Sequence, residues 1–229
     1  MISFPAPALC QFSDQELLVW LGQAIFPGFV EMPSNENGLR LWVEGEPPDD
    51  AARQVATSRF QILLGVLRAW RADAGELEDE RRAGLGSGPV RNETGAQWVT
   101  VGPAVAYTSF GRPEVEHFAD GARQAMRASQ NLENSLWLNG RASRTAADYY
   151  MIHEYAGRQY GGEKGIRQTL GISVDAQRRL KASANNLSPL DGGRHVRGRG
   201  IAPMSLADQR RFSSDLLKRW IRHAAAKVG

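Results

Sequence analysis

A single cysteine, Cys10, and the lack of any long apolar run set the first limits on this chain of 229 residues. One cysteine excludes an intramolecular disulfide and a metal site built from several cysteines, and such scarcity is usual in a reducing compartment. The N-terminal residues lack a basic segment followed by an apolar one, and no stretch approaches the roughly 18 apolar residues of a membrane span. We therefore expect a cytoplasmic protein with no membrane partner.

Lysine is absent from residues 1–140, where 11 arginines stand against 18 acidic side chains, which gives a net charge of −7. Residues 141–229 hold all four lysines, and their 17 basic and 7 acidic side chains give +10. An asymmetry of this kind indicates an anionic partner for the basic part, usually nucleic acid. The alternative is that the two parts pack against each other and partly cancel their charges.

Hydrophobic residues make up 42% of the chain and charged residues 23%, which is the balance of an ordinary globular protein. Helices are predicted where apolar residues recur at helical spacing, at about 14–25, 50–70, 113–138, 145–160, 163–170, 174–184 and 206–226. Strands are predicted at 38–44, 97–101 and 104–109. The expected fold is mainly α (α+β), with a small acidic α+β region at 1–130 followed by a basic helical bundle at 131–229.

Motifs for metal or cofactor chemistry are incomplete in this sequence. His153 and Glu154 begin like a zinc-protease motif, but Gly157 stands where the second histidine is required. His117 has acidic neighbours on an exposed helix face, where such charges are usually only solvated. We predict no metal site and no cofactor, and the sequence leaves open whether the protein is an enzyme.

The segment that follows the helix predicted at 174–184 concentrates polar groups that can bind phosphate. It contains four glycines together with Asn185, Asn186, Arg194, His195, Arg197 and Arg199. Arginine binds phosphate in a bidentate manner, histidine exchanges protons near neutral pH, and glycine allows a phosphate backbone to come close. We expect RNA rather than DNA as the ligand. The alternative is a structural loop whose arginines bind helix carbonyls and whose asparagines cap turns.

Residues 149–200, which begin YYMIHEYAGRQYGGEKGIRQTLGI, resemble the helical region of uncharacterised bacterial HEPN-like proteins of defence systems and mobile elements. HEPN ribonucleases resemble one another in an arginine, usually followed by a polar residue, with a histidine a few residues further on; a dimer brings two such motifs together. Arg194 and His195 match the start of this motif, but no second histidine follows at the expected spacing. The resemblance implies RNA binding, antiviral defence and a homodimer, with at most degenerate ribonuclease chemistry. In such chemistry His195 would be the general acid or base, and Arg194 would stabilise the scissile phosphate.

A helix-turn-helix is a competing interpretation of some of these residues. The run IRQTLGISVDAQRRL at 166–180 contains Gly171 at a turn and a second helix that we expect to expose Gln177, Arg178 and Arg179. A recognition helix needs polar residues that face the major groove and an apolar inner side. Helix–glycine–helix corners also occur in plain helical domains. Duplex DNA binding is therefore an alternative to RNA binding.

Tyr149 and Tyr150 are adjacent, so on a helix they point about 100° apart and at most one can face fully inward.

The opposite charges of the two halves also allow an alternative function without nucleic acid. In that case the protein is a non-catalytic interaction module whose basic helices dock onto an acidic protein, or onto a second copy of this chain.

Overall fold

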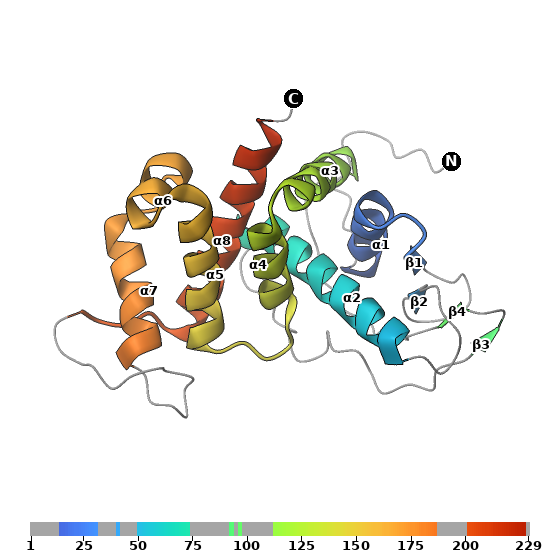
Figure 1. Cartoon of the computed structure of the whole chain (residues 1–229), viewed down its shortest axis with the longest axis horizontal. Coiled ribbons are helices and arrows are strands. Elements are labelled where there is room, and N and C mark those ends of the chain that lie inside the picture. Colours follow the sequence, from blue (N-terminus) through green and yellow to red (C-terminus); the bar gives the residue numbers. More distant parts are fainter. Residues whose placement is uncertain are drawn as a thin grey trace. The chain divides into compact units, whose positions relative to one another are not determined.

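The computed structural model describes residues 14–31, 40–41, 50–73, 92–93, 96–97, 112–186 and 201–227. Within these ranges the chain forms eight α-helices, one short 3-10 helix and four strands of two residues each (Figure 1). The mainly α fold predicted from the sequence is confirmed. Two compact units can be distinguished, Met1–Ala56 with Glu76–Ala119 and Thr57–Gly75 with Asp120–Gly229. The second unit therefore includes residues 57–75 and 120–130, which the division predicted at residue 130 places in the N-terminal region.

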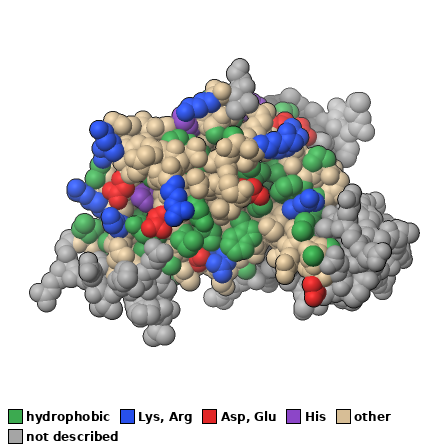
Figure 2. Space-filling model, in the orientation of Figure 1, with side chains coloured by type: hydrophobic (Ala, Val, Ile, Leu, Met, Phe, Trp, Pro, Cys, Tyr) green, Lys and Arg blue, Asp and Glu red, His purple; other side chains and the backbone are tan. Residues whose placement is uncertain are grey.

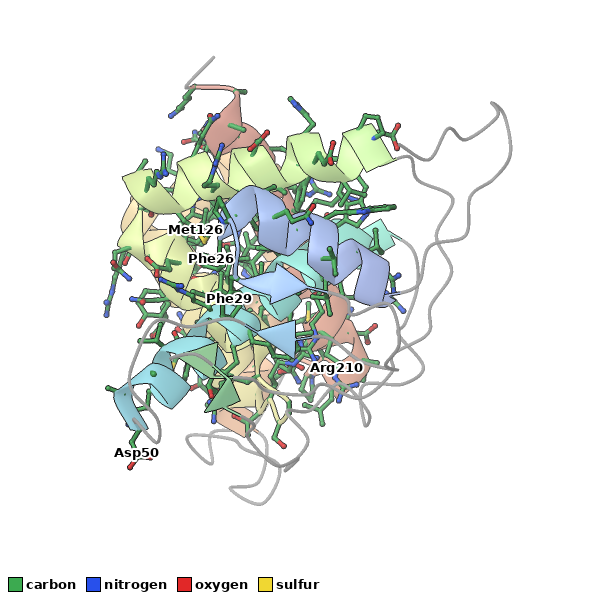
Figure 3. All side chains as sticks on the ribbon, turned by 90° about the vertical axis from the view of Figure 1, so that its right-hand side faces the viewer. Phe26, Phe29, Asp50, Met126 and Arg210 are labelled. Carbon is green, nitrogen blue, oxygen red and sulfur yellow. The ribbon has the colours of Figure 1, made fainter. Side chains whose placement is uncertain are left out.

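The first unit contains α1 at Asp14–Ile25, as predicted, and the antiparallel strands β1 at Val30–Glu31 and β2 at Arg40–Leu41. Leucines on one side of α1 are buried, and the rings of Phe26 and Phe29 meet edge to face 5.9 Å apart (Figure 3). Strands β3 at Asn92–Glu93 and β4 at Ala96–Gln97 form a second pair.

Most of the strands predicted at 38–44, 97–101 and 104–109 lie outside the described residues. Only β2 and the last residue of β4 fall within the predicted ranges. Two-residue pairs do not show an α+β arrangement, so the α+β character of the N-terminal region stays a prediction.

The second unit is built from helices. They are the C-terminal parts of α2 at Asp50–Trp70 and α3 at Arg112–Ala128, the 3-10 helix η1 at Arg71–Asp73, α4 at Gln130–Gly140, α5 at Ala146–Tyr160, α6 at Glu163–Leu170, α7 at Val174–Asn186 and α8 at Leu206–Ala225. Helix α5 is central, since it contacts α4, α6, α7 and α8. Its inward residues Tyr149 and Ile152 are fully buried, while Tyr150 is half-buried. At most one of the two adjacent tyrosines therefore faces fully inward, as the sequence required.

Local capping residues set the ends of these helices. The Thr145 hydroxyl accepts a hydrogen bond from the backbone N–H of Asp148, whose carboxylate accepts one from the Thr145 N–H in return, and this capping box begins α5. Gly161 ends α5 and Gly171 ends α6, each with a positive φ that favours glycine. Ser173 accepts a hydrogen bond from the backbone N–H of Ala176 at the start of α7.

The helix expected at 113–138 is interrupted, which corrects the prediction. Helix α3 ends at Ala128, and Ser129 takes an extended conformation with φ −149°. The Ser129 hydroxyl accepts a hydrogen bond from the N–H of Leu132 and donates one to the side chain of Gln159 on α5 at 2.8 Å. A serine side chain that bonds in this way favours a cap over a helix interior. Two helices therefore replace the single long one.

Helices α2 and α4 approach each other with almost no side chains between their backbones. A Cβ atom on Gly65 would overlap the backbone of Leu136, and one on Gly140 would overlap the backbone of Gln61. The Asn139 side chain donates a hydrogen bond to the carbonyl oxygen of Gly65 at 3.1 Å. This close contact needs glycine at both positions.

Buried arginines satisfy the carbonyl groups at the end of α4. Arg68 donates to the carbonyl oxygens of Asn139 at 2.5 Å and of Arg141 at 3.0 Å. Arg144 donates to the same Asn139 carbonyl oxygen at 3.1 Å and lies over the ring of Tyr149. The last carbonyls of a helix have no partner within it, so side chains such as these commonly bind them.

Candidate nucleic-acid interface

Four of the residues expected to bind phosphate lie outside the described part of the chain: Arg194, His195, Arg197 and Arg199. The structure therefore does not test whether they come together. Asn185 and Asn186 are described as the last two residues of α7, although the side chain of Asn186 is not. Both asparagines therefore belong to α7, which is two residues longer than predicted, and not to the loop expected to start at Asn185.

The residues that follow this loop are fixed to α7. Ser183, fully buried on α7, accepts a hydrogen bond from the backbone N–H of Met204 at 2.7 Å. The Met204 carbonyl oxygen accepts one from the Gln209 side chain at 3.1 Å, and the Ser205 hydroxyl caps α8. The chain therefore leaves α7 at Asn186 and is bound to α7 again at Met204, through Ser183.

An exposed polar stripe runs along α7 toward the start of that segment. It consists of Arg178, Lys181 and Asn185, whose spacing of three and four residues places them on one side of a helix. Arg178 and Lys181 are exposed, and Asn185 is half-buried. We call these three residues the α7 stripe. Two of them, Arg178 and Asn185, were predicted from the sequence as nucleic-acid contacts.

Arg179 and Gln177 flank Arg178 on α7, one on either side. Arg179 is half-buried, about 100° around the helix from Arg178. Gln177, which we expected to be exposed, is 2% exposed, so that prediction is wrong. Its side chain bonds to His153 on α5 instead of facing solvent. The side chain of His153 is thus bound within the core of the second unit.

Helices α6 and α7 form a corner at Gly171 that packs on α5 (Figure 1). Ile166, Leu170 and Ile172 are buried in this corner. Arg219 on α8 donates to the carbonyl oxygens of Leu170 at 3.2 Å and Gly171 at 3.4 Å, which fixes the corner to α8. The helix–glycine–helix geometry expected from the sequence is present.

Basic side chains outnumber acidic ones on these two helices, five to two. On the face shown in Figure 2, Lys and Arg side chains gather over α6 and α7. Lys181 pairs with Glu163 at 3.5 Å, but both side chains are about half exposed, so this pair contributes little to stability. Within the described ranges, no carboxylate forms an ion pair with the other four, which are Lys164, Arg167, Arg178 and Arg179. Their charge is available to an anionic partner.

Sequence reasoning missed one member of the stripe and one buried pair. Lys181 could have been found, because it follows Arg178 by three residues on a predicted helix. The pairing of His153 with Gln177 left no such signal, since the two residues are 24 positions apart.

A second polar contact joins α5 to α8 at Tyr160 and His223, whose Oη and Nδ1 atoms are 3.1 Å apart. Burial raises the pKa of Tyr160 to about 12, so its hydroxyl keeps its proton and can donate to His223. Burial, and then the positive charge of Lys227, lower the pKa of His223. Neutral histidine is the form that accepts the tyrosine hydrogen bond.

The described ranges contain no group of three or more His, Cys, Asp and Glu side chains placed to hold a metal ion. None of their helices is long and apolar enough to cross a bilayer. No family model, curated protein or solved structure matches the chain. Function is therefore inferred from the residues and their geometry.

Proposed function

We propose that this protein binds nucleic acid, RNA rather than DNA, through the α7 stripe and the arginine-rich segment that follows α7. The stripe carries the proposal, because Arg178 and Lys181 share one exposed side of α7 and Asn185 continues that side toward the segment. Neutralisation of phosphates by such cations supplies most of the affinity of nucleic-acid complexes and makes it dependent on salt.

RNA is the polymer we propose because of the sequence of the segment at 187–200. Its glycines and the side chains of Arg194, His195, Arg197 and Arg199 suit an irregular, single-stranded phosphate backbone. The resemblance to HEPN-like proteins adds a role in defence and a homodimer to this proposal, and the scarcity of cysteine adds a cytoplasmic location. Any ribonuclease activity would depend on Arg194 and His195. RNA cleavage that persisted after both were changed to alanine would remove that part of the proposal.

Fluorescence anisotropy with labelled single-stranded RNA, single-stranded DNA and duplex DNA, each titrated at several salt concentrations, tests the proposal. We expect RNA to bind most tightly and the logarithm of the binding constant to fall linearly with the logarithm of the salt concentration. For a single strand, the steepness of this line decreases by about 0.7 for each phosphate that the protein no longer neutralises. Arg178→Ala and Lys181→Ala should each decrease the steepness by about this amount.

Arg179→Ala is the matched control, since it removes the same charge from another side of α7. Its effect on the slope should be smaller than that of Arg178→Ala. Equal effects would mean that the general positive charge, and not the stripe, attracts the ligand. Failure of all three polymers to bind would favour the interaction module, in which the basic helices dock onto an acidic protein or a second copy.

Duplex DNA is a second candidate ligand, supported by the corner between α6 and α7. The corner has a glycine turn, buried apolar residues on its inner side and Arg178 on its outer side. These are features of a helix-turn-helix whose second helix enters the major groove. Tighter binding of duplex DNA than of RNA in the same titration, abolished in Arg178→Ala, would support this candidate over the first.

A further inference from the structure

A single buried amide connects α7 to three other parts of the second unit. The Gln177 Oε1 atom lies 2.9 Å from Nε2 of His153 on α5. The Nε2 atom of Gln177 donates to the carbonyl oxygens of Glu163 at 3.3 Å and Ile172 at 3.4 Å, at the start of α6 and in the turn before α7. The two carbonyls can only accept, which fixes the amide orientation and makes His153 Nε2 the donor.

The histidine at the other end of this contact is itself held in place. The His153 ring stacks on Tyr150 at 6.0 Å and lies 6.3 Å from the ring of Phe212 on α8. His153 is 4% exposed. Gln177 therefore bonds to a partner that cannot shift with α7.

Gln177 lies on the inward side of α7 together with the fully buried Leu180 and Ala184. Successive helical residues are rotated by about 100°. With Gln177 directed inward, Arg178 lies about 100° further around the helix and points to solvent, and Asn185 follows at a similar angle. Lys181, only about 40° from Gln177, is exposed at the edge of the stripe. Beside the bond of Ser183 to Met204, Gln177 supplies three directional bonds on this inward side, whereas an apolar side chain at position 177 would add only packing without direction.

We propose that Gln177 is a positioning residue, which fixes the rotation of α7 through His153, Glu163 and Ile172 and so directs the α7 stripe toward the ligand. The effect of Gln177 on RNA affinity rests on the proposed nucleic-acid binding, whereas its effect on the stability of the corner between α6 and α7 does not. These two effects are tested separately.

Hydrogen exchange of backbone amides tests the corner in the absence of any ligand. Gln177→Leu removes all three hydrogen bonds and should speed exchange at residues 171–177 by at least about tenfold, because the loss of even one buried hydrogen bond can account for that factor. Gln168→Leu makes the same chemical change at an exposed position of α6 and should leave this exchange unchanged. If Gln177→Leu exchanges like the wild type at these residues, the proposal is wrong whether or not the protein binds nucleic acid.

Affinity tests the positioning of the stripe, with RNA as the probe. His153→Gln keeps a donor for Gln177 and should bind within about twofold of the wild type, whereas His153→Leu should bind about two- to tenfold more weakly. The double variant with His153→Leu and Gln177→Leu lacks both polar groups. Its melting temperature should return toward that of the wild type, but its affinity for RNA should stay low. If the affinity returned as well, the role of Gln177 would be purely structural and the proposal would be overturned.

The two hypotheses fail in different ways. Wild-type protein that binds none of the three polymers contradicts the proposed function and leaves hydrogen exchange to decide the role of Gln177. The positioning role alone is contradicted if the wild-type protein binds RNA and Gln177→Leu leaves both the affinity and the salt slope unchanged.

Discussion

The hydroxyl of Tyr160 lies 3.1 Å from Nδ1 of His223 and joins the C-terminal turn of α5 to that of α8. Trp220, one turn earlier on α8, packs edge to face against the same tyrosine ring at 5.7 Å. A neutral His223 ring whose Nδ1 carries no proton accepts a hydrogen bond from the Tyr160 hydroxyl, and a protonated ring cannot accept one there. The contact therefore links the stability of the second unit to pH.

We expect the melting temperature to fall as the pH is lowered from about 7.5 to about 5.5, and to fall less in His223→Gln. Burial lowers the pKa of His223 in the folded state below the ordinary value for histidine of about 6.5. The unfolded chain therefore takes up the proton first, so this stabilisation is complete above about pH 6.5 and is lost as the pH falls through the lowered pKa. Calorimetry at both pH values measures the difference. An identical fall in the two proteins would contradict the assignment to His223.

Gly140→Ala should destabilise the protein by about 1–3 kcal/mol, because its Cβ would overlap the carbonyl oxygen of Gln61 on α2. Gly157→Ala on α5 is the control. The nearest atom to a Cβ there is 3.8 Å away, so this change should be neutral or stabilising by up to about 1 kcal/mol. Urea unfolding measures both variants. A Gly140→Ala protein as stable as the wild type would show that α2 and α4 separate at little cost.

Ser183→Ala should cost about 1–3 kcal/mol in urea unfolding. It leaves the backbone N–H of Met204 without its 2.7 Å acceptor at a fully buried position. Ser143→Ala removes an exposed hydroxyl and should change stability by less than about 0.5 kcal/mol. Similar effects of the two substitutions would mean that the contact between Ser183 and Met204 does not hold the chain in solution.

Thr145→Ala should lower stability by about 1 kcal/mol, since it removes the hydroxyl that caps α5. Thr145→Ser keeps a hydroxyl at the same place and should recover most of this loss. The free energy of unfolding from denaturant titration compares the three proteins. Equal stability of the alanine and serine variants would mean that water replaces the cap.

The helix limits that could be predicted from the sequence are those set by neighbouring residues. Gly161, Gly171 and Ser173 end or begin helices through bonds within a few positions, and their chemistry is visible in the sequence. The break at Ser129 was missed, because serine is tolerated in a helix as well as at a cap. Its hydrogen bond to Gln159, 30 residues away, joins this capping serine to α5.

The candidate interface was predictable to a similar degree. The basic character of α6 and α7 and the corner at Gly171 follow from composition and spacing. The burial of Gln177 does not, because a glutamine is expected at the surface unless its partner is known. His153, which supplies that partner, stands out in the sequence only as part of an incomplete metal-binding motif.

The contact between Ser183 and Met204 also bears on how this protein could diversify. Because the chain is held on either side of residues 187–200, a change in the number of residues between these points need not disturb α7 or α8. Doubling the length of a connection between two fixed points costs only about 0.6 kcal/mol of closure entropy. The helices can therefore be kept while longer, shorter or grafted segments are placed at this position.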